Sequence, residues 1–306
     1  MKHKPQIIAI LLGMFLLAQF IGLYVINHYS VPSNQLPLGM GYPQTDLTCT
    51  INSIFDFFTC TQYLGTIVFA FIIAILLFLF LTRIKAEFII RIWFFFVIAI
   101  ALLITLQSFI PQFNYAFLIA GLIAVILAFL KVFKRNIIVH NATELLVYPG
   151  IAAIFVPILN IYTVLILLVL ISIYDMWAVW HSGIMQKMAK YQIDKVRVFS
   201  GFFVPYISKK VRLQMKKLKK SQLKNKKIKV NVAILGGGDV VFPIITAGVV
   251  MLTYGLLYSL FVIVGAASGL LLLFIYSEKK KFYPAMPFIT TGIFAGLLIG
   301  LLVSLL

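Results

Sequence analysis

The sequence predicts an all-α, polytopic membrane protein with nine transmembrane helices, its N-terminus inside and its C-terminus outside. Three observations lead to this prediction. The 306 residues are 62% hydrophobic and 11% charged, with a mean hydropathy of +1.07, whereas soluble domains are roughly 45–50% apolar and about 25% charged. Nine apolar runs are long enough to cross a bilayer as helices. The basic residues all fall on one side of those runs.

A bilayer core is crossed by ~20 apolar residues in a helix. The runs of about that length are 5–26, 63–82, 86–106, 113–131, 139–158, 161–181, 231–252, 256–276 and 284–306. The first run follows Lys2 and Lys4 as a signal peptide would, but its length fits a full span and no small-residue cleavage site follows it. The seventh and eighth runs form one apolar block, which we expect to turn at Thr253-Tyr254-Gly255.

The orientation follows from the basic residues. All 26 Lys and Arg residues fall in the segments that lie inside when the N-terminus is inside. The outside loops carry Asp46 and Asp56 as their only charges. Because Lys and Arg concentrate in cytoplasmic loops, this count fixes the number of spans as well as their direction.

The longest inside loop, 182–230, divides the chain into an N-terminal part, 1–181, and a C-terminal part, 231–306. Its basic run Lys209–Lys229 predicts binding to anionic lipid head groups, at ~1 kcal/mol per basic residue near the surface. Nucleic acid is not expected as a partner, since no aromatic or Gly-rich motif accompanies the run. A surface amphipathic helix is expected around Val196–Ile207.

Both cysteines, Cys49 and Cys60, lie in the outside loop after the first span. Two interpretations stay open: a disulfide that closes this loop in an oxidising compartment, and two unpaired small residues. No His or acidic residue stands at metal-ligand spacing to either cysteine. We therefore expect no metal and no cofactor.

Two aspartates stand alone inside apolar spans, Asp175 in the sixth and Asp239 in the seventh. An ionised carboxylate in hydrocarbon is costly, so such a residue indicates a functional site. Counted from His181 and Val230, at ~1.5 Å per residue, the two acids lie at depths of ~9 and ~13 Å. Because consecutive spans are antiparallel, we expect the two side chains to face each other in the inner half of the membrane.

Two carboxylates in contact share one proton and titrate as a pair. The ionised oxygen then takes a proton from a bound water, while the protonated partner polarises a peptide carbonyl, as in aspartic proteases. No Ser–His pair and no HExxH metal site in the sequence competes for this role.

Glycines and prolines stand beside these acids. Gly236, Gly237 and Gly238 precede Asp239, and each disfavours a helix by ~1 kcal/mol. Two interpretations stay open for them: close helix packing, and strand-like backbone that pairs with an extended peptide. The segment Tyr283–Pro287 opens the last span with non-helical backbone, which a membrane tolerates where protein buries it or a cavity faces it. A helix that simply begins at a proline has the same pattern.

Three motifs resemble one known family. Tyr174-Asp175 in the sixth span, Gly236-Gly237-Gly238-Asp239 in the seventh and Pro284-Ala285-Met286-Pro287 in the ninth resemble the YD, GxGD and PAL motifs of the presenilin and signal peptide peptidase family. The order of the motifs and their spans match, so the resemblance covers the whole chain and is nearest to presenilin-like microbial, archaeal-type members. One departure is Met286, which stands where the family has leucine.

The resemblance implies an intramembrane aspartyl endopeptidase that cuts the transmembrane helices of single-span proteins. It implies that Asp175 and Asp239 are the catalytic dyad. It also implies substrate-binding and site-shaping roles for Tyr174, Gly236, Gly237, Gly238, Pro284, Ala285, Met286 and Pro287. The inside N-terminus predicts substrates whose own N-terminus is outside, and a prokaryotic member would lie in the plasma membrane.

The alternative function is a proton- or cation-coupled transporter or channel that uses the same acids. Such a protein is expected to show internal repeats and acids at mid-membrane, whereas no repeat is visible here and the acids are off-centre. A non-catalytic membrane scaffold leaves both acids unexplained. The sequence identifies no obligate protein subunit.

Two further patterns have structural interpretations. Polar residues at the start of the fifth span are interpreted as an edge at the membrane interface: His140, Asn141 and Glu144. Small residues that recur every fourth position predict helix-packing faces: Gly265 and Gly269, then Gly292, Gly296 and Gly300.

Overall fold

The computed structural model describes residues 5–31, 62–84, 87–111, 113–134, 136–182, 200–206, 231–277 and 283–304. Its long helices are α1 (Pro5–Ser30), α3 (Gln62–Arg83), α4 (Glu87–Phe109), α5 (Ala116–Phe133), α6 (Ile137–Phe155), α7 (Ile161–Trp177), α11 (Gly237–Tyr254), α12 (Leu256–Tyr276) and α13 (Met286–Val303). A 3₁₀ turn, η1 (Val156–Ile158), continues α6, and a π-helical turn, η2 (Ala178–Ser182), continues α7.

The protein is mostly helical, as the sequence predicts. Over the described residues, eight helices are long and apolar enough to cross a membrane. Helix α3 is not among these eight, but it has 22 residues and lies where the second span is expected. The predicted turn between the seventh and eighth spans is confirmed, because α11 ends at Tyr254 and Gly255 follows with a φ of 103° that glycine adopts without strain.

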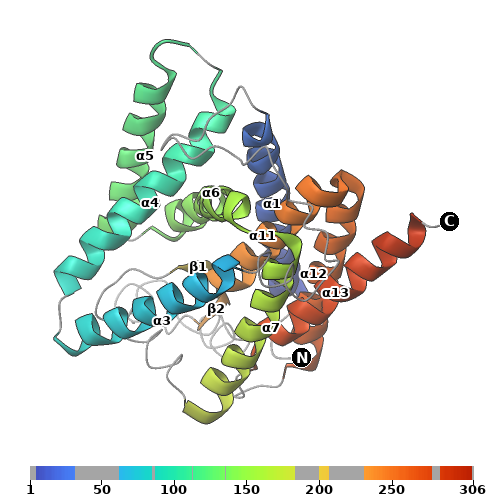
Figure 1. Ribbon diagram of the computed structural model, residues 1–306. Coiled ribbons are helices and arrows are strands. Elements are labelled where there is room, and N and C mark those ends of the chain that lie inside the picture. The colour runs from blue at the N-terminus through green and yellow to red at the C-terminus, as the bar shows by residue number, and fades with distance from the viewer. Residues whose placement is uncertain are drawn as a thin grey trace, which may run out of the picture.

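The helices lie in three groups. Helices α1, α6 and α11 pack against one another at the centre of the molecule, with α4 and α5 on one side and α12 and α13 on the other (Figure 1). Glycines let helices approach closely in two places: a Cβ on Gly150 of α6 would meet the backbone of Ala101 in α4, and one on Gly248 of α11 would lie 2.5 Å from Ile26 of α1. Helices α1 and α6 therefore hold α11 in place.

The predicted glycine packing faces are confirmed. A Cβ on Gly265 of α12 would meet the carbonyl oxygen of Gly292 in α13, and the converse holds for Gly292. Gly269 and Gly296 meet the backbone of the facing helix in the same way. Because lipid tails give no hydrophobic drive for helices to associate, this close backbone approach and its van der Waals contacts join α12 to α13.

Two strands stand where helix was expected. Strand β1 (Gly201–Tyr206) pairs antiparallel with β2 (Asn231–Gly236), with Gly201 opposite Gly236. The prediction that the seventh helix starts at 231 is wrong, since α11 begins at Gly237. The predicted surface helix around Val196–Ile207 is wrong over 201–206. Over the described residues the fold is therefore helical with one two-stranded sheet, not purely all-α.

The local sequence explains the strands. In β2, Ala233 and Leu235 are buried while Val232 and Ile234 are each 43% exposed, the alternation of a strand. In β1, Pro205 disfavours a helix interior, and aromatic and β-branched residues around it favour a strand. A six-residue apolar run does not by itself distinguish a buried helix from a strand. Consequently Asp239 lies in the first turn of its helix, and its estimated depth of ~13 Å along a helix from Val230 is wrong.

Several predicted features lie outside the described residues. They are the outside-loop charges Asp46 and Asp56, the cysteines Cys49 and Cys60, and the basic run Lys209–Lys229.

Candidate active site

Asp175 lies near the C-terminal end of α7 and touches the start of α13. Its side chain is buried, and its Oδ2 accepts a hydrogen bond of 3.1 Å from the backbone N–H of Met286. The N-cap residue of α13 is Ala285, which has no side-chain acceptor to offer. Asp175 therefore satisfies a free N–H group at the positive end of the α13 dipole.

This contact gives a physical reason for the Pro-Ala-Met-Pro segment. Pro287 falls in the first turn of α13, where a helix needs no N–H donor. Met286 contributes its backbone N–H to Asp175, so the bond does not depend on which side chain stands there. The Met286 side chain is buried in the core, where an apolar residue of leucine's volume also fits. The departure from leucine thus leaves the contact with Asp175 intact.

A second polar contact joins α7 to α13 close to Asp175. The hydroxyl groups of Ser172 and Thr290 lie 2.8 Å apart, and both residues are buried. The Ser172 hydroxyl also bonds the carbonyl oxygen of Leu168 at 2.8 Å within its own helix. The position of Asp175 relative to α13 is thereby fixed at two points.

Asp239 lies in the first turn of α11, directly after the glycines. Its carboxylate accepts a hydrogen bond from the backbone N–H of Gly236, and a Cβ on Gly236 would lie 3.1 Å from its Oδ2. Asp175 and Asp239 are close enough for a direct charge interaction. The structure therefore brings the two isolated acids of the sequence to one place.

The three glycines before Asp239 have different surroundings. A Cβ on Gly237 would lie 2.5 Å from the Ser200 hydroxyl and 3.1 Å from the Tyr148 ring, whereas one on Gly238 would come no nearer than 3.8 Å to Phe242. Gly237 also donates its N–H to the carbonyl oxygen of Ser200 at 3.2 Å. Gly237 therefore allows close packing, and Gly236 ends a strand that pairs with β1, while pairing of this backbone with an extended peptide stays a prediction.

We expect Gly237→Ala to lower the stability of the protein and Gly238→Ala to leave it almost unchanged. Overpacking at a tight site costs ~1–3 kcal/mol, and the open side of Gly238 imposes no such cost. Thermal unfolding of the two variants in the same detergent measures the difference. Equal melting temperatures would contradict the crowding at Gly237.

Tyr174 lies on the same turn as Asp175 and lines a cavity. The cavity has a volume of about 310 Å³ and lies between α3 and α7. The other side chains that line it are aliphatic, among them Val68, Ile72 and Leu76 of α3 and Leu167 and Ile171 of α7. An apolar space thus reaches the residue next to the first acid.

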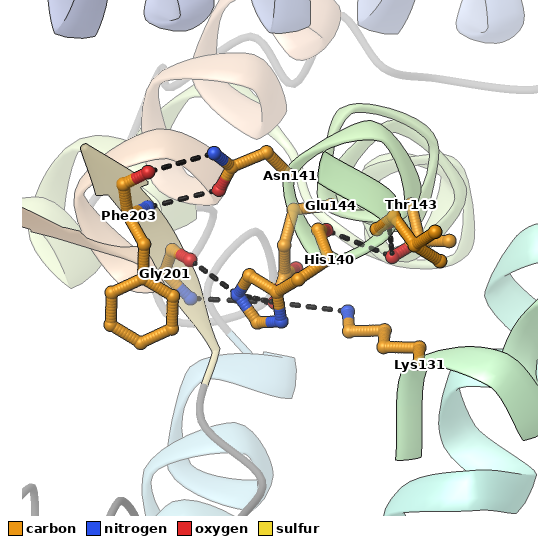
Figure 2. Close-up of polar contacts among 8 residues, drawn as sticks. Lys131, His140, Asn141, Thr143, Glu144, Gly201 and Phe203 are labelled. Atoms are coloured by element: carbon orange, nitrogen blue, oxygen red, sulfur yellow. Dashed lines mark hydrogen bonds and ion pairs between the residues drawn. The ribbon is translucent and has the colours of Figure 1, made fainter. Parts of the chain in front are cut away.

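Sequence reasoning missed a polar cluster beside the strands. Lys131, at the end of α5, forms a buried ion pair of 2.9 Å with Glu144 of α6. His140 and Asn141 of α6 bond the backbone of β1, as Figure 2 shows. The interpretation of His140, Asn141 and Glu144 as an interfacial edge did not foresee these contacts. The available signal was the spacing of His140 and Glu144, which places them on one helix face.

Comparison with solved structures shows the same fold in an intramembrane protease. Two crystal forms of a presenilin family intramembrane aspartate protease match, one in space group C222 and one in P2. The first is 19% identical, with a TM-score of 0.61 over 97% of this chain and 99% of that chain. The second is 18% identical, with a TM-score of 0.58 over 96% of each chain. No curated protein matches the chain in a sequence comparison.

This fold, with eight apolar helices of membrane-spanning length among the described residues, is that of an integral, multi-pass membrane protein. A family model described as "Signal-peptide peptidase, presenilin aspartyl protease" matches residues 46–306. The chain therefore belongs to the signal peptide peptidase and presenilin family, and it is an intramembrane aspartic endopeptidase.

Proposed function

We propose that Asp175 and Asp239 hydrolyse peptide bonds inside the transmembrane helices of single-span proteins. The observation that supports this most is the charge interaction between the two acids, which come from the end of α7 and the start of α11. The ionised carboxylate takes a proton from a water whose oxygen attacks the peptide carbonyl carbon. The protonated partner gives its proton to the carbonyl oxygen, so a neutral gem-diol forms. The acid that took the proton from water then protonates the amide nitrogen as the C–N bond breaks, and the other carboxylate takes a proton back from a gem-diol hydroxyl group, which restores the starting dyad.

The substrate is proposed to reach the acids from the membrane. The cavity between α3 and α7 is apolar, so a helix in the bilayer meets no polar barrier there. In a helix the backbone N–H and C=O groups are bonded to each other, so the substrate segment that is cleaved has to unwind before its peptide bond can reach the acids. The strand backbone that ends at Gly236 lies directly before Asp239 and offers hydrogen-bonding groups to such an extended segment.

We further propose that the protein has nine spans with the N-terminus inside: the eight helices that are long and apolar enough to cross a membrane, and α3 as the ninth. Charged and polar contacts link the C-terminal ends of α5 and α7 to the N-terminal ends of α6 and α13, as alternating spans require. The one-sided distribution of all 26 basic residues sets the direction. In a prokaryotic cell we expect the protein in the plasma membrane, with the basic residues of segment 182–230 close to anionic lipid head groups.

The proposal is tested with purified protein, a single-span substrate and mass spectrometry of the products. Wild type is expected to cut within the apolar segment, and Asp175→Ala and Asp239→Ala are expected to give no product. Thr291→Val, on an exposed residue whose hydroxyl bonds only α13 itself, is the matched control and should cut normally. Cleavage that persists in either acid variant refutes the dyad, and proton flux into proteoliposomes without cleavage would favour the transporter.

We expect the enzyme to prefer substrates whose N-terminus is outside. The orientation of the dyad across the membrane selects the direction in which a substrate strand can lie in the site. Two substrates with the same apolar segment and opposite flanking charges, reconstituted in defined orientation, measure the preference. Efficient cleavage of the N-inside substrate alone would contradict the proposed topology.

A further inference from the structure

The outer edge of β1 is already occupied by side chains of α6. Asn141 donates from Nδ2 to the carbonyl oxygen of Phe203 at 2.8 Å, and the N–H of Phe203 donates to Asn141 Oδ1 at 2.9 Å (Figure 2). Two residues that exchange both an N–H and a C=O bond form the hydrogen-bonded pair of an antiparallel sheet. The amide of Asn141 thus takes the place that one residue of a third strand would take.

The neighbouring outward positions of β1 are closed as well. Two residues before Phe203, the carbonyl oxygen of Gly201 lies 2.8 Å from His140 Nε2, and the Gly201 N–H donates to Glu144 Oε1 at 3.4 Å. Two residues after Phe203 stands Pro205, which has no N–H to offer. Each outward-facing residue of β1 is therefore either bonded to α6 or lacks a donor.

The alternation of a strand then identifies the open edge. Because Gly201 and Phe203 face α6, the residues between and after them, Phe202 and Val204, face β2. Their partners in the register are Leu235 and Ala233. The intervening residues, Val232 and Ile234, consequently direct their N–H and C=O groups away from β1, and no hydrogen bond to them is found in the described part of the chain.

A buried ion pair holds the residues that close β1. The Lys131 and Glu144 side chains are only 2% and 0% exposed, and Glu144 Oε1 lies 2.9 Å from Lys131 and 3.7 Å from His140 Nε2. Such a pair contributes little net stability, but it fixes the geometry of the groups around it. Tyr148, one turn after Glu144, packs edge-on against Phe202 with ring centroids 5.3 Å apart. The hairpin is thereby attached to α6 on both its edge and its face.

We propose that Asn141, with His140, Glu144 and Lys131, forms an edge lock, whose task is to leave β2 as the docking edge for the substrate strand. This inference rests on the proposed protease function and deepens it. A substrate strand then pairs with Val232 and Ile234, and its next residues pass Gly236 and reach Asp239. Asn141 is a positioning residue, because it acts on the substrate only through the hairpin.

The lock is tested first without catalysis, by hydrogen exchange on the inactive Asp239→Asn protein with and without a transmembrane substrate peptide. The peptide is expected to slow exchange in 231–236 and to leave 200–206 as slow as before. Adding Asn141→Ala should speed exchange in 200–206 by about tenfold, since two hydrogen bonds are lost. Thr143→Val is the matched control, because Thr143 bonds only its own helix and its removal should change nothing in the hairpin.

Cleavage by the active enzyme gives the second readout. Asn141→Ala should raise KM about fivefold or more with kcat nearly unchanged, and should add products displaced by two residues, the slip that keeps the same strand face. Asn141→Asp keeps the acceptor for the Phe203 N–H and should fall between wild type and Asn141→Ala. Unchanged exchange in 200–206, unchanged cleavage sites or peptide protection on 200–206 would each overturn the lock. Failure of wild type to cleave would instead refute the proposed function, and the exchange experiment still decides on the lock.

Discussion

Asp175→Asn is expected to abolish cleavage and to leave the protein nearly as stable as wild type. Asparagine has the shape of aspartate, and its Oδ1 still accepts the hydrogen bond from the Met286 N–H. It has no exchangeable carboxyl proton and no ionised form, so the pair can no longer supply both a base for the water and an acid for the carbonyl oxygen. Loss of this acid–base step should lower kcat/KM by about a thousandfold or more. Product formation and the melting temperature, measured on the same preparation, check both halves of the prediction.

Asp175→Ala separates the chemical role from the structural one. It removes the same proton acceptor, but it also leaves the buried Met286 N–H without its partner. An unsatisfied buried donor costs ~1–3 kcal/mol, so this variant should be inactive and also less stable than Asp175→Asn. Equal stability of the two variants would show that the bond to Met286 contributes nothing, and activity in Asp175→Asn would rule out Asp175 as an acid or base.

The helices and the two acids were predictable because a bilayer restricts both the length and the composition of the segments that cross it. Apolar runs have a length set by the hydrocarbon core, and a charge inside them is rare enough to be noticed, as at Asp175 and Asp239. The role of Met286 was not predictable from its residue type. Met286 contacts Asp175 through its backbone N–H, which every residue except proline has. No pattern of side chains in the sequence can therefore indicate this contact.

The hairpin and its lock were missed for a different reason. Strand β2 is an apolar run that continues directly into α11. The hydrophobic pattern therefore predicted one helix that starts at 231. The partner of β2, strand β1, is separated from it in the sequence by residues 207–230, and pairing between distant segments leaves no local signal. Lys131, the last residue of the predicted span 113–131, was expected only as one of the basic residues at the inside face. Its burial against Glu144 depends on how α5 and α6 meet in space.

A second large effect is expected at the contact between α12 and α13. In Gly265→Ala, the new Cβ would meet the carbonyl oxygen of Gly292, and backbone cannot rotate away as a side chain can. The two helices must therefore separate, at a cost of ~1–3 kcal/mol. Since α13 begins with the N–H that bonds Asp175, a shifted α13 should also lower cleavage.

The control is Gly121→Ala in α5, where a Cβ meets nothing within 4 Å. Alanine is the better helix former by ~1 kcal/mol, so this variant should be as stable as wild type or more so. Gly292→Ala repeats the clash from the other helix, and combining it with Gly265→Ala should cost less than the sum, because both act on one contact. Thermal unfolding in detergent measures all four proteins against wild type. If Gly265→Ala and Gly121→Ala unfold at the same temperature, α12 and α13 do not meet backbone to backbone.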